Sequence, residues 1–248
     1  MRTLNLNNNG VNVKAFLSDN NSVEQIVVAI HGLGGDSKSS VICALANELT
    51  KYSIAVIAFD LPCHGKDQTQ GRLSLQKCLE YLMEVEKLVK EKYFNIPLSY
   101  FATSFGAYLL LNHINNSDLK YNKIILKSPA IFMDEVIKNK ILKEHNYTLQ
   151  DLKKQQLNVG FEKDIFIDFN FYNELLVNKL DKFSTKNYFN IIQGKKDNIV
   201  DWKQNERFFK KFCKNNYIIK YFKNADHRFK EAGELEKIIR ITKDILLN

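Results

Sequence analysis

The chain has 248 residues, of which 45% are hydrophobic, and it has a formal charge of +8 with a pI near 9.1. This length suits one large α/β domain with a modest insertion, and the hydrophobic fraction allows a sizeable core. The lysines are scattered along the chain rather than gathered in one basic segment. A nucleic-acid-binding protein is therefore disfavoured, and we expect a solvated, lysine-rich surface.

Cysteine usage and apolar runs indicate the compartment. The four cysteines show no C-x-x-C or other metal-ligand spacing, so we expect free thiols in a reducing compartment. The first residues, MRTLNLNNNG, lack the apolar stretch of a signal peptide. No apolar run reaches the ~18 residues that a membrane span needs. The sequence therefore predicts a cytoplasmic protein without a membrane span.

Short apolar runs alternate with longer helical patterns along the chain. Several runs, such as IVVAI and IAVIAF, are almost continuously apolar, which is typical of strands buried on both faces of a mostly parallel sheet. The expected strands are residues 11–17, 25–31, 54–60, 98–103, 123–128, 188–193 and 217–222.

Helical spacing of apolar residues lies between these runs. From about residue 74 to residue 93, Leu75, Leu79, Leu82 and Val85 fall on one stripe. Similar patterns predict helices at about 39–51, 105–115, 201–214 and 231–247. This alternation predicts an α/β fold with a mostly parallel, doubly wound sheet flanked by helices.

One segment breaks the alternation. Between Pro129 and about Lys182 there is no clean buried strand, and DEVIKNKILKEH and LQDLKKQQLN have the pattern of amphipathic helices. A span of this length between two core strands is too long for a plain loop. We therefore expect a core made of residues 1–128 and 183–248, with residues 129–182 inserted as a cap over one edge of the sheet.

The segment LSYFATSFG places a candidate nucleophile, Ser104, between a buried strand and a helix. A sharp strand-to-helix turn exposes the hydroxyl, and the helix N-terminus offers a free N–H to a developing oxyanion. The crowded turn requires small residues two before and two after the serine, here Ala102 and Gly106. Because the usual pattern is G-x-S-x-G, Ala102 is a departure, although alanine is still small. A helix-capping serine is the alternative.

A second segment, IHGLGG at residues 30–35, directly follows another expected strand. Its glycines allow the loop to bend toward Ser104 without clashes, so the N–H groups of Leu33 and Phe105 are the candidate oxyanion donors. A glycine-rich turn without catalytic role is the alternative. Nucleotide binding is disfavoured, because the segment is not G-x-G-x-x-G and no G-K-S/T follows it.

Ser104 needs a base, and the base needs an orienting acid. Of the five histidines, His227 in NADHRF lies just beyond the last expected strand and is the candidate base. We expect structural roles for His31 and His64, while His113 lies within a helix and His145 within the cap.

Asp197 in QGKKDNIV follows an earlier core strand and is the candidate acid, with a turn residue as the alternative. Asp201 is a rival that is better placed as a helix cap before Trp202. Asp226 is a weaker rival, because it neighbours His227 directly in sequence. The resulting chain order of serine, aspartate and histidine is the order that α/β-hydrolases use.

These segments resemble the α/β-hydrolase superfamily, and most of all its small bacterial esterase branch, which includes feruloyl and cinnamoyl esterases and enzymes similar to monoacylglycerol lipase. The resemblance covers nearly the whole chain and rests on HGLGG, FDLPCHGKD, ATSFGA, QGKKDNIV and NADHRF, with FNFYNELLVNKLD in the cap. It implies Ser104 as nucleophile, Asp197 as acid and His227 as base, with oxyanion donors at Leu33 and Phe105.

Two positions depart from the family pattern, Ala102 in place of glycine and Arg228 directly after the histidine, and neither removes a catalytic group. The expected reaction is hydrolysis of a small carboxylic ester through an acyl-enzyme, without a metal or an organic cofactor. A thioesterase, amidase or peptidase with the same triad stays open, as does a non-catalytic binding protein of this fold. A homodimer is also open.

The cap is expected to set substrate choice. Its aromatic residues are candidates for an apolar pocket, and packing of the cap onto the sheet is the equally weighted alternative. These residues are Phe161, Phe166, Phe169, Phe171 and Tyr172.

Overall fold

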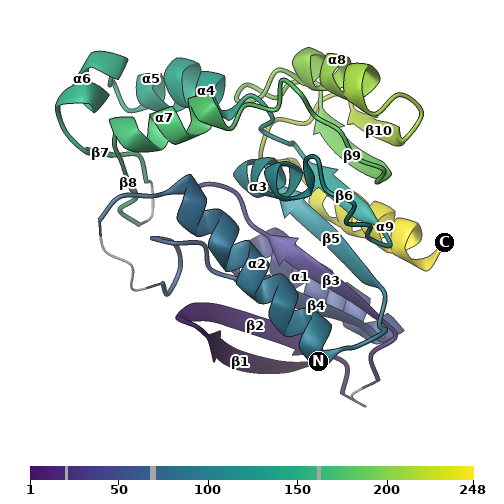
Figure 1. The fold of residues 1–248 in the computed structure, drawn as a ribbon. Coiled ribbons are helices and arrows are strands. Elements are labelled where there is room, and N and C mark those ends of the chain that lie inside the picture. The colour runs from purple at the N-terminus through teal and green to yellow at the C-terminus, as the bar shows by residue number, and fades with distance from the viewer. Residues whose placement is uncertain (20–21, 68–70, 161–162) are drawn as a thin grey trace.

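The computed structural model describes residues 1–19, 22–67, 71–160 and 163–248. In these residues eight strands form one sheet in the order β1-β2-β4-β3-β5-β6-β9-β10 (Figure 1). Neighbours from β4 to β10 pair in parallel, whereas β2 pairs antiparallel with both β1 and β4. The mostly parallel sheet predicted from the sequence is confirmed. The strands are β1 (Arg2–Asn8), β2 (Val11–Leu17), β3 (Gln25–Ile30), β4 (Ile54–Phe59), β5 (Leu98–Thr103), β6 (Ile124–Lys127), β9 (Phe189–Gly194) and β10 (Tyr217–Phe222).

The central strands form because their residues are apolar on both faces. Every residue of β3 and of β4 is buried, as expected for strands covered by helices on both sides. Strand β1 has no counterpart among the expected strands. Its residues are exposed or half-buried, and it lies at the sheet edge, where it pairs with β2 along its whole length. Backbone pairing rather than an apolar pattern therefore defines this strand.

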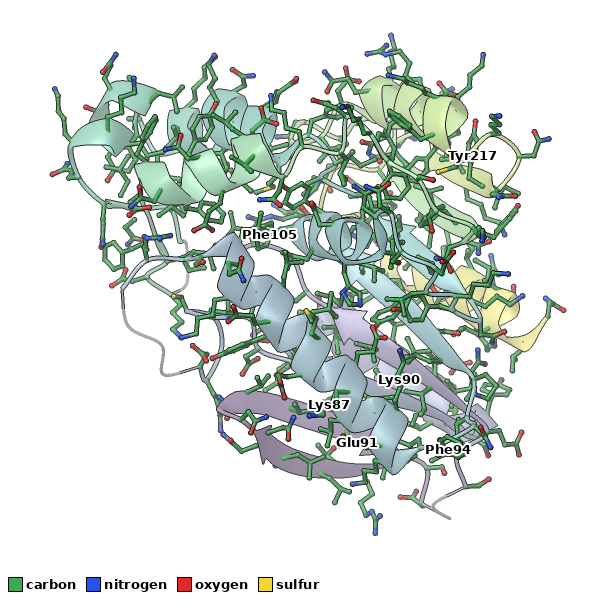
Figure 2. All side chains as sticks on the ribbon, viewed as in Figure 1. Lys87, Lys90, Glu91, Phe94, Phe105 and Tyr217 are labelled. Atoms are coloured by element: carbon green, nitrogen blue, oxygen red, sulfur yellow. The ribbon has the colours of Figure 1, made fainter. Side chains whose placement is uncertain are left out.

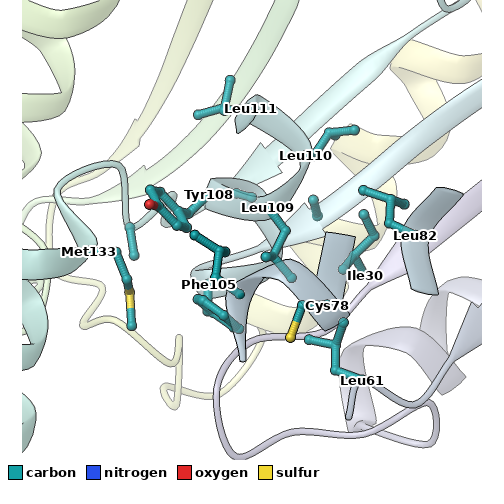
Figure 3. Packing of buried hydrophobic residues seen from close by; sticks show 14 of the residues in the cluster. Ile30, Leu61, Cys78, Leu82, Phe105, Tyr108, Leu109, Leu110, Leu111 and Met133 are labelled. Atoms are coloured by element: carbon teal, nitrogen blue, oxygen red, sulfur yellow. The ribbon is translucent and has the colours of Figure 1, made fainter. Parts of the chain in front are cut away.

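Helices cover the two faces of the sheet (Figure 1). On one face, α1 (Ser40–Leu49) and α9 (Glu234–Leu247) contribute to the smaller apolar core of the described residues. On the other face, α2 (Leu75–Lys92), α3 (Phe105–Ile114) and α8 (Trp202–Phe212) contribute to the larger one. Figure 3 shows the side chains of α3, among them Phe105, Tyr108 and Leu109, within this larger core. A short 3₁₀ turn, η1 (Thr50–Tyr52), follows α1.

Between β6 and β9 the chain leaves the sheet and forms a group of short elements, at the upper left of Figure 1. The first amphipathic helix predicted there is present but is interrupted by a π-turn. The second begins with a capping box at Thr148 and ends at Lys154, so it is shorter than predicted, because the last two residues of the segment form a strand. The elements are α4 (Met133–Val136), η2 (Ile137–Ile141), α5 (Leu142–Glu144), α6 (Leu149–Lys154), β7 (Leu157–Asn158), β8 (Phe166–Ile167) and α7 (Phe169–Val177).

This segment is attached to the start of α2. Arg72 forms ion pairs with Asp168 at 3.1 Å and with Glu174 at 3.2 Å. The Leu73 amide donates to the carbonyl of Phe166 at 2.6 Å. Charged and backbone contacts therefore hold α7 and β8 against the loop that leads into α2.

The four cysteines are free thiols, as expected from their spacing. Cys63, Cys78 and Cys213 are buried, and Cys43 is half-buried. Within the described residues, no helix has both the length and the apolar character that crossing a bilayer requires.

Candidate active site

Ser104 lies in the single-residue turn between β5 and α3. Its backbone has φ 51° and ψ −113°, a left-handed conformation that L-residues rarely adopt. Backbone hydrogen bonds hold the turn, among them those from the Ser104 amide to the Lys127 carbonyl (3.0 Å) and from the Ala107 amide to the Ser104 carbonyl (3.0 Å). Ala102 is fully buried in β5, so the sharp turn forms with alanine at this position.

The glycines around the turn are required by close backbone contacts. A Cβ on Gly106 would lie 2.5 Å from the carbonyl oxygen of His31 and 2.8 Å from that of Ile30. A Cβ on Gly32 would lie 3.2 Å from the Cβ of Ser104. The first turn of α3 and the loop after β3 therefore pack directly against one another, with the serine between them.

The structure brings Ser104, His227 and Asp197 together. His227 Nε2 lies 3.0 Å from Ser104 Oγ, and His227 Nδ1 lies 2.9 Å from Asp197 Oδ2. When Nδ1 carries the proton and donates it to the carboxylate, Nε2 is free to accept from the serine hydroxyl. These contacts span 30 and 123 positions of the chain, so the fold and not the local sequence creates them.

Asp197 is held as a buried, charged group. Its side chain is fully buried and accepts hydrogen bonds from the amides of Ile199 (3.0 Å) and Val200 (2.8 Å) and from Gln193 Nε2 (3.0 Å). Burial acts to raise the pKa of this carboxyl, but the hydrogen bonds from His227 and the two amides outweigh it and hold the pKa below its usual value. The acid is therefore ionised and oriented toward the imidazole.

The loop that carries His227 is tied to the end of β6. The carbonyl of His227 accepts from Lys127 Nζ at 3.1 Å and from Ser128 Oγ at 3.3 Å. Lys127 is buried beside the ring of Phe229, with Nζ 4.5 Å from the ring centroid, and burial lowers its pKa to about 8. Sequence analysis did not single out this lysine, although a lysine that ends the apolar run IILK is an unusual feature.

Two buried histidines shape the loop after β3. His31 Nε2 accepts from the Leu61 amide, and His64 Nε2 accepts from the Gly34 amide, both at 3.1 Å. Burial lowers the pKa of His64 to about 3 and also lowers that of His31, so both rings stay neutral and can accept. Both histidines therefore support the glycine loop, as the sequence analysis expects.

The two expected oxyanion donors flank the serine. Phe105 is the first residue of α3, and Leu33 lies in the β-turn that the hydrogen bond from the Gly35 amide to the Gly32 carbonyl (3.0 Å) closes. Within the described part of the chain, neither the Leu33 amide nor the Phe105 amide has a hydrogen-bond acceptor. Both N–H groups are thus available to a developing negative charge.

The rival acids, Asp201 and Asp226, make other contacts. Asp201 caps α8 by accepting from the Lys203 amide at 2.8 Å, as predicted. Asp226 accepts from the amides of Arg228 (2.9 Å) and Phe229 (2.6 Å) and so stabilises a turn. Ser104 makes no side-chain capping bond to α3, because its hydroxyl faces His227 instead.

A cavity of about 500 Å³ opens beside Ser104. Its walls come from the glycine loop, the start of α1 and the ends of β5 and β6. In the part of the chain that the structure describes, its lining includes Lys38, Ser39, Thr103, Lys127 and Arg228. Charged and hydroxyl side chains thus lie beside Leu33 and Val41 in this wall.

The role of the cap aromatics in an apolar pocket stays a prediction. Phe166, Phe169 and Tyr172 are not among the described residues that line the cavity, and Phe161 lies outside the described residues. Phe171 is fully buried with its ring 6.2 Å from that of Phe105, and Tyr172 is 7% exposed. Phe171 and Tyr172 therefore pack α7 against the larger core.

The arrangement can perform nucleophilic chemistry, because a hydroxyl, a base and an acid meet beside two unpaired amides. Across the described ranges, no three His, Cys, Asp or Glu side chains are grouped so that they could hold a metal ion.

Comparison with known proteins identifies the family and the fold of the chain. A family model for hydrolases, described as serine aminopeptidase S33, matches residues 21–168. No curated protein sequence matches the chain significantly.

Among solved structures, Est1E from Butyrivibrio proteoclasticus with ferulic acid bound is 18% identical, with 98% of each chain covered and a TM-score of 0.77. Monoglyceride lipase from Saccharomyces cerevisiae is 17% identical over 99% of this chain and 94% of that one, with a TM-score of 0.75. Monoacylglycerol lipase from Paleococcus ferrophilus is 17% identical over 99% and 98%, with a TM-score of 0.70. The fold is thus that of the α/β-hydrolases, and the chain belongs to the hydrolase family described as serine aminopeptidase S33.

Proposed function

We propose that this hydrolase cleaves small carboxylic esters, with Ser104 as nucleophile, His227 as base and Asp197 as the orienting acid. The observation that carries the proposal is the continuous path from Asp197 through the imidazole to the serine hydroxyl, with distances of 2.9 and 3.0 Å. The strained turn supports it, because a rare backbone conformation persists only where surrounding structure holds it, and such positions cluster at active sites.

In the proposed reaction, His227 Nε2 removes the proton of Ser104 Oγ as that oxygen attacks the ester carbonyl. The amides of Leu33 and Phe105 donate to the oxyanion of the tetrahedral intermediate. When the intermediate collapses, the C–O bond to the alcohol breaks and Nε2 returns the proton to the leaving oxygen. Water then attacks the acyl-enzyme with the same base, which releases the acid and restores the serine hydroxyl.

The test is covalent labelling combined with turnover. We expect the wild-type chain to react with a fluorophosphonate probe at Ser104 and to hydrolyse 4-nitrophenyl acetate and butyrate. Ser104→Ala is expected to lose labelling and to lower kcat by about 10⁵–10⁶-fold, because removal of the nucleophile abolishes the acyl-enzyme route. Ser99→Ala, at a buried serine of β5 remote from the catalytic end, is the matched control for labelling. Undiminished turnover by Ser104→Ala would refute the proposal.

Peptide or amide cleavage is the second candidate, because the matching family model is described as a serine aminopeptidase. The same groups serve an amide, provided that His227 protonates the leaving amine. A panel of aminoacyl-4-nitroanilides beside 4-nitrophenyl esters separates the two activities. A kcat/KM for the anilides equal to or above that for the esters would favour the aminopeptidase.

A further inference from the structure

The cavity beside Ser104 has a positively charged wall. Lys38, Lys127 and Arg228 line it, and Asp36 is the single carboxylate among the described lining residues. Asp36 Oδ1 already accepts from the Lys38 amide at 2.7 Å. The described lining therefore carries more positive than negative charge at the position where a substrate of Ser104 lies.

The start of helix α1 in the same wall also suits an anion. Helix α1 begins at the cavity, and its first turn contains no acidic residue that would occupy its amides. Its N-cap residue, Ser39, makes no capping hydrogen bond with its side chain. Ser39 Oγ and Thr103 Oγ1 are both buried, and neither has a hydrogen-bond partner within the described residues. Buried hydroxyls without partners are uncommon in folded proteins.

Lys127 places a buried cation in the same wall. The residue is 5% exposed, and its Nζ donates to the His227 carbonyl. Among the described residues no carboxylate oxygen forms an ion pair with Nζ. A buried cation without a carboxylate partner costs solvation energy. A substrate anion that enters the cavity would offset this cost at the moment of binding.

We propose that the natural substrates of Ser104 are esters that carry an anionic group, a carboxylate or a phosphate, and that this group lies in the cavity lined by Lys38, Lys127 and Arg228. The inference rests on the proposed ester hydrolysis and narrows its substrate class. The anion can belong to the acyl part or to the alcohol part, and the experiment separates these cases.

The test compares matched charged and neutral esters at low ionic strength. For the acyl part, mono-4-nitrophenyl adipate is compared with its methyl ester. For the alcohol part, 4-acetoxybenzoate and 4-acetoxyphenyl phosphate are compared with methyl 4-acetoxybenzoate. We expect at least one anionic ester to have a kcat/KM roughly tenfold above that of its neutral partner, and the ratio to fall toward one in 0.5 M salt, because salt screens partly exposed charges.

Substitutions that each remove one positive charge show which residues produce the preference for anionic esters. Lys38→Gln and Arg228→Gln are each expected to lower the anionic-to-neutral ratio by about threefold or more. Lys87→Gln is the matched control, because Lys87 is an exposed lysine on α2, far along the helix from Phe105 and the catalytic turn (Figure 2). It should leave the ratio unchanged.

A binding measurement separates this inference from the proposed function. Ser104→Ala is expected to bind mono-4-nitrophenyl adipate more tightly than the methyl ester in equilibrium titration, whether or not turnover occurs. Ratios near or below one for all pairs, with turnover of neutral esters intact, would overturn the anionic preference alone. Loss of the preference in Lys87→Gln to the same extent as in Lys38→Gln would also overturn it. Failure of every ester would contradict the proposed hydrolysis instead.

Discussion

Among the described residues, a carboxylate and an imidazole form an ion pair in two places, Asp197 with His227 and Glu86 with His113. The oxygen–nitrogen distances are 2.9 and 2.8 Å, and both carboxylates are buried. In the first pair, the other ring nitrogen of the histidine lies 3.0 Å from Ser104 Oγ. In the second pair, the nitrogen that contacts Glu86 also lies 3.4 Å from Tyr121 Oη. The same two groups therefore occupy different chemical settings.

Glu86 has several donors besides the imidazole. Tyr100 and Tyr121 donate their hydroxyls to it at 2.7 and 2.8 Å, and Lys90 forms an ion pair with it from the next turn of α2. Figure 2 shows Lys90 on the half of α2 that is remote from Phe105. Burial raises the pKa of Glu86, but the hydrogen bonds outweigh burial and hold the pKa at about 2. The Glu86–His113 pair therefore stabilises the fold through these hydrogen bonds. The Asp197–His227 pair faces a strained serine beside free amides and can act in catalysis.

Removing the acid from each pair should separate these roles most clearly. Asp197→Asn is expected to lower kcat for 4-nitrophenyl butyrate by about 10⁴-fold, because the asparagine no longer stabilises the imidazolium and favours the wrong tautomer. Circular dichroism and size-exclusion chromatography should show a folded chain. A loss below tenfold would contradict the assigned role of Asp197.

Glu86→Gln should lower the stability of the fold and leave catalysis unchanged. We expect the free energy of unfolding to fall by about 2–4 kcal/mol, because three donors and a lysine lose a charged acceptor in a buried place. At temperatures where the variant is folded, kcat should stay within a factor of two of the wild-type value. Urea denaturation and ester hydrolysis, measured on one preparation, check both parts. A fall of kcat that exceeds tenfold in the folded variant would place Glu86 in the catalytic site.

The acid stability of the chain should depend on Glu86. Its pKa in the folded chain, about 2, lies below its ordinary value of 4.5, so the native state binds fewer protons than the unfolded state between these values. The contribution, about 3 kcal/mol by the size of the shift, is present above pH 4.5 and is lost as the pH falls toward 2. Unfolding free energies between pH 6 and pH 2 should therefore converge for the wild type and Glu86→Gln. Parallel curves would rule out this linkage.

Lys127→Met tests the buried lysine that contacts the loop of His227. Removal of a buried cation should raise the free energy of unfolding at pH 7 by about 1–3 kcal/mol. Burial lowers the pKa of Lys127 from 10.5 to about 8, so the unfolded state binds more protons between these values and the wild type gains stability as the pH rises through them. The advantage of the methionine variant should thus shrink from pH 7 to pH 10. A destabilised variant would mean that the hydrogen bond to the His227 carbonyl outweighs the cost of burial.

Local patterns predicted most elements of this fold. Continuous apolar runs located β3, β4 and β5 nearly to the residue, because strands buried on both faces need apolar side chains throughout. The stripe from Leu75 onward located α2, whose cap, Ser74, accepts from the Lys77 amide. Strand β1 was missed, because a polar edge strand is defined by backbone bonds to its neighbour and has no apolar pattern of its own.

The sequence by itself determined the fold class and the chemical types available at the catalytic edge: a serine in a tight strand-to-helix turn, a glycine loop, and an aspartate and a histidine after late strands. Tertiary structure alone decided which donors and acceptors meet. It set the 3.0 Å contact between residues 104 and 227 and brought Lys38, Lys127 and Arg228 to one cavity. The reason is physical: apolar periodicity is a local property of the chain, whereas hydrogen-bond geometry and the balance of charge in a cavity depend on segments that only the folded sheet brings together.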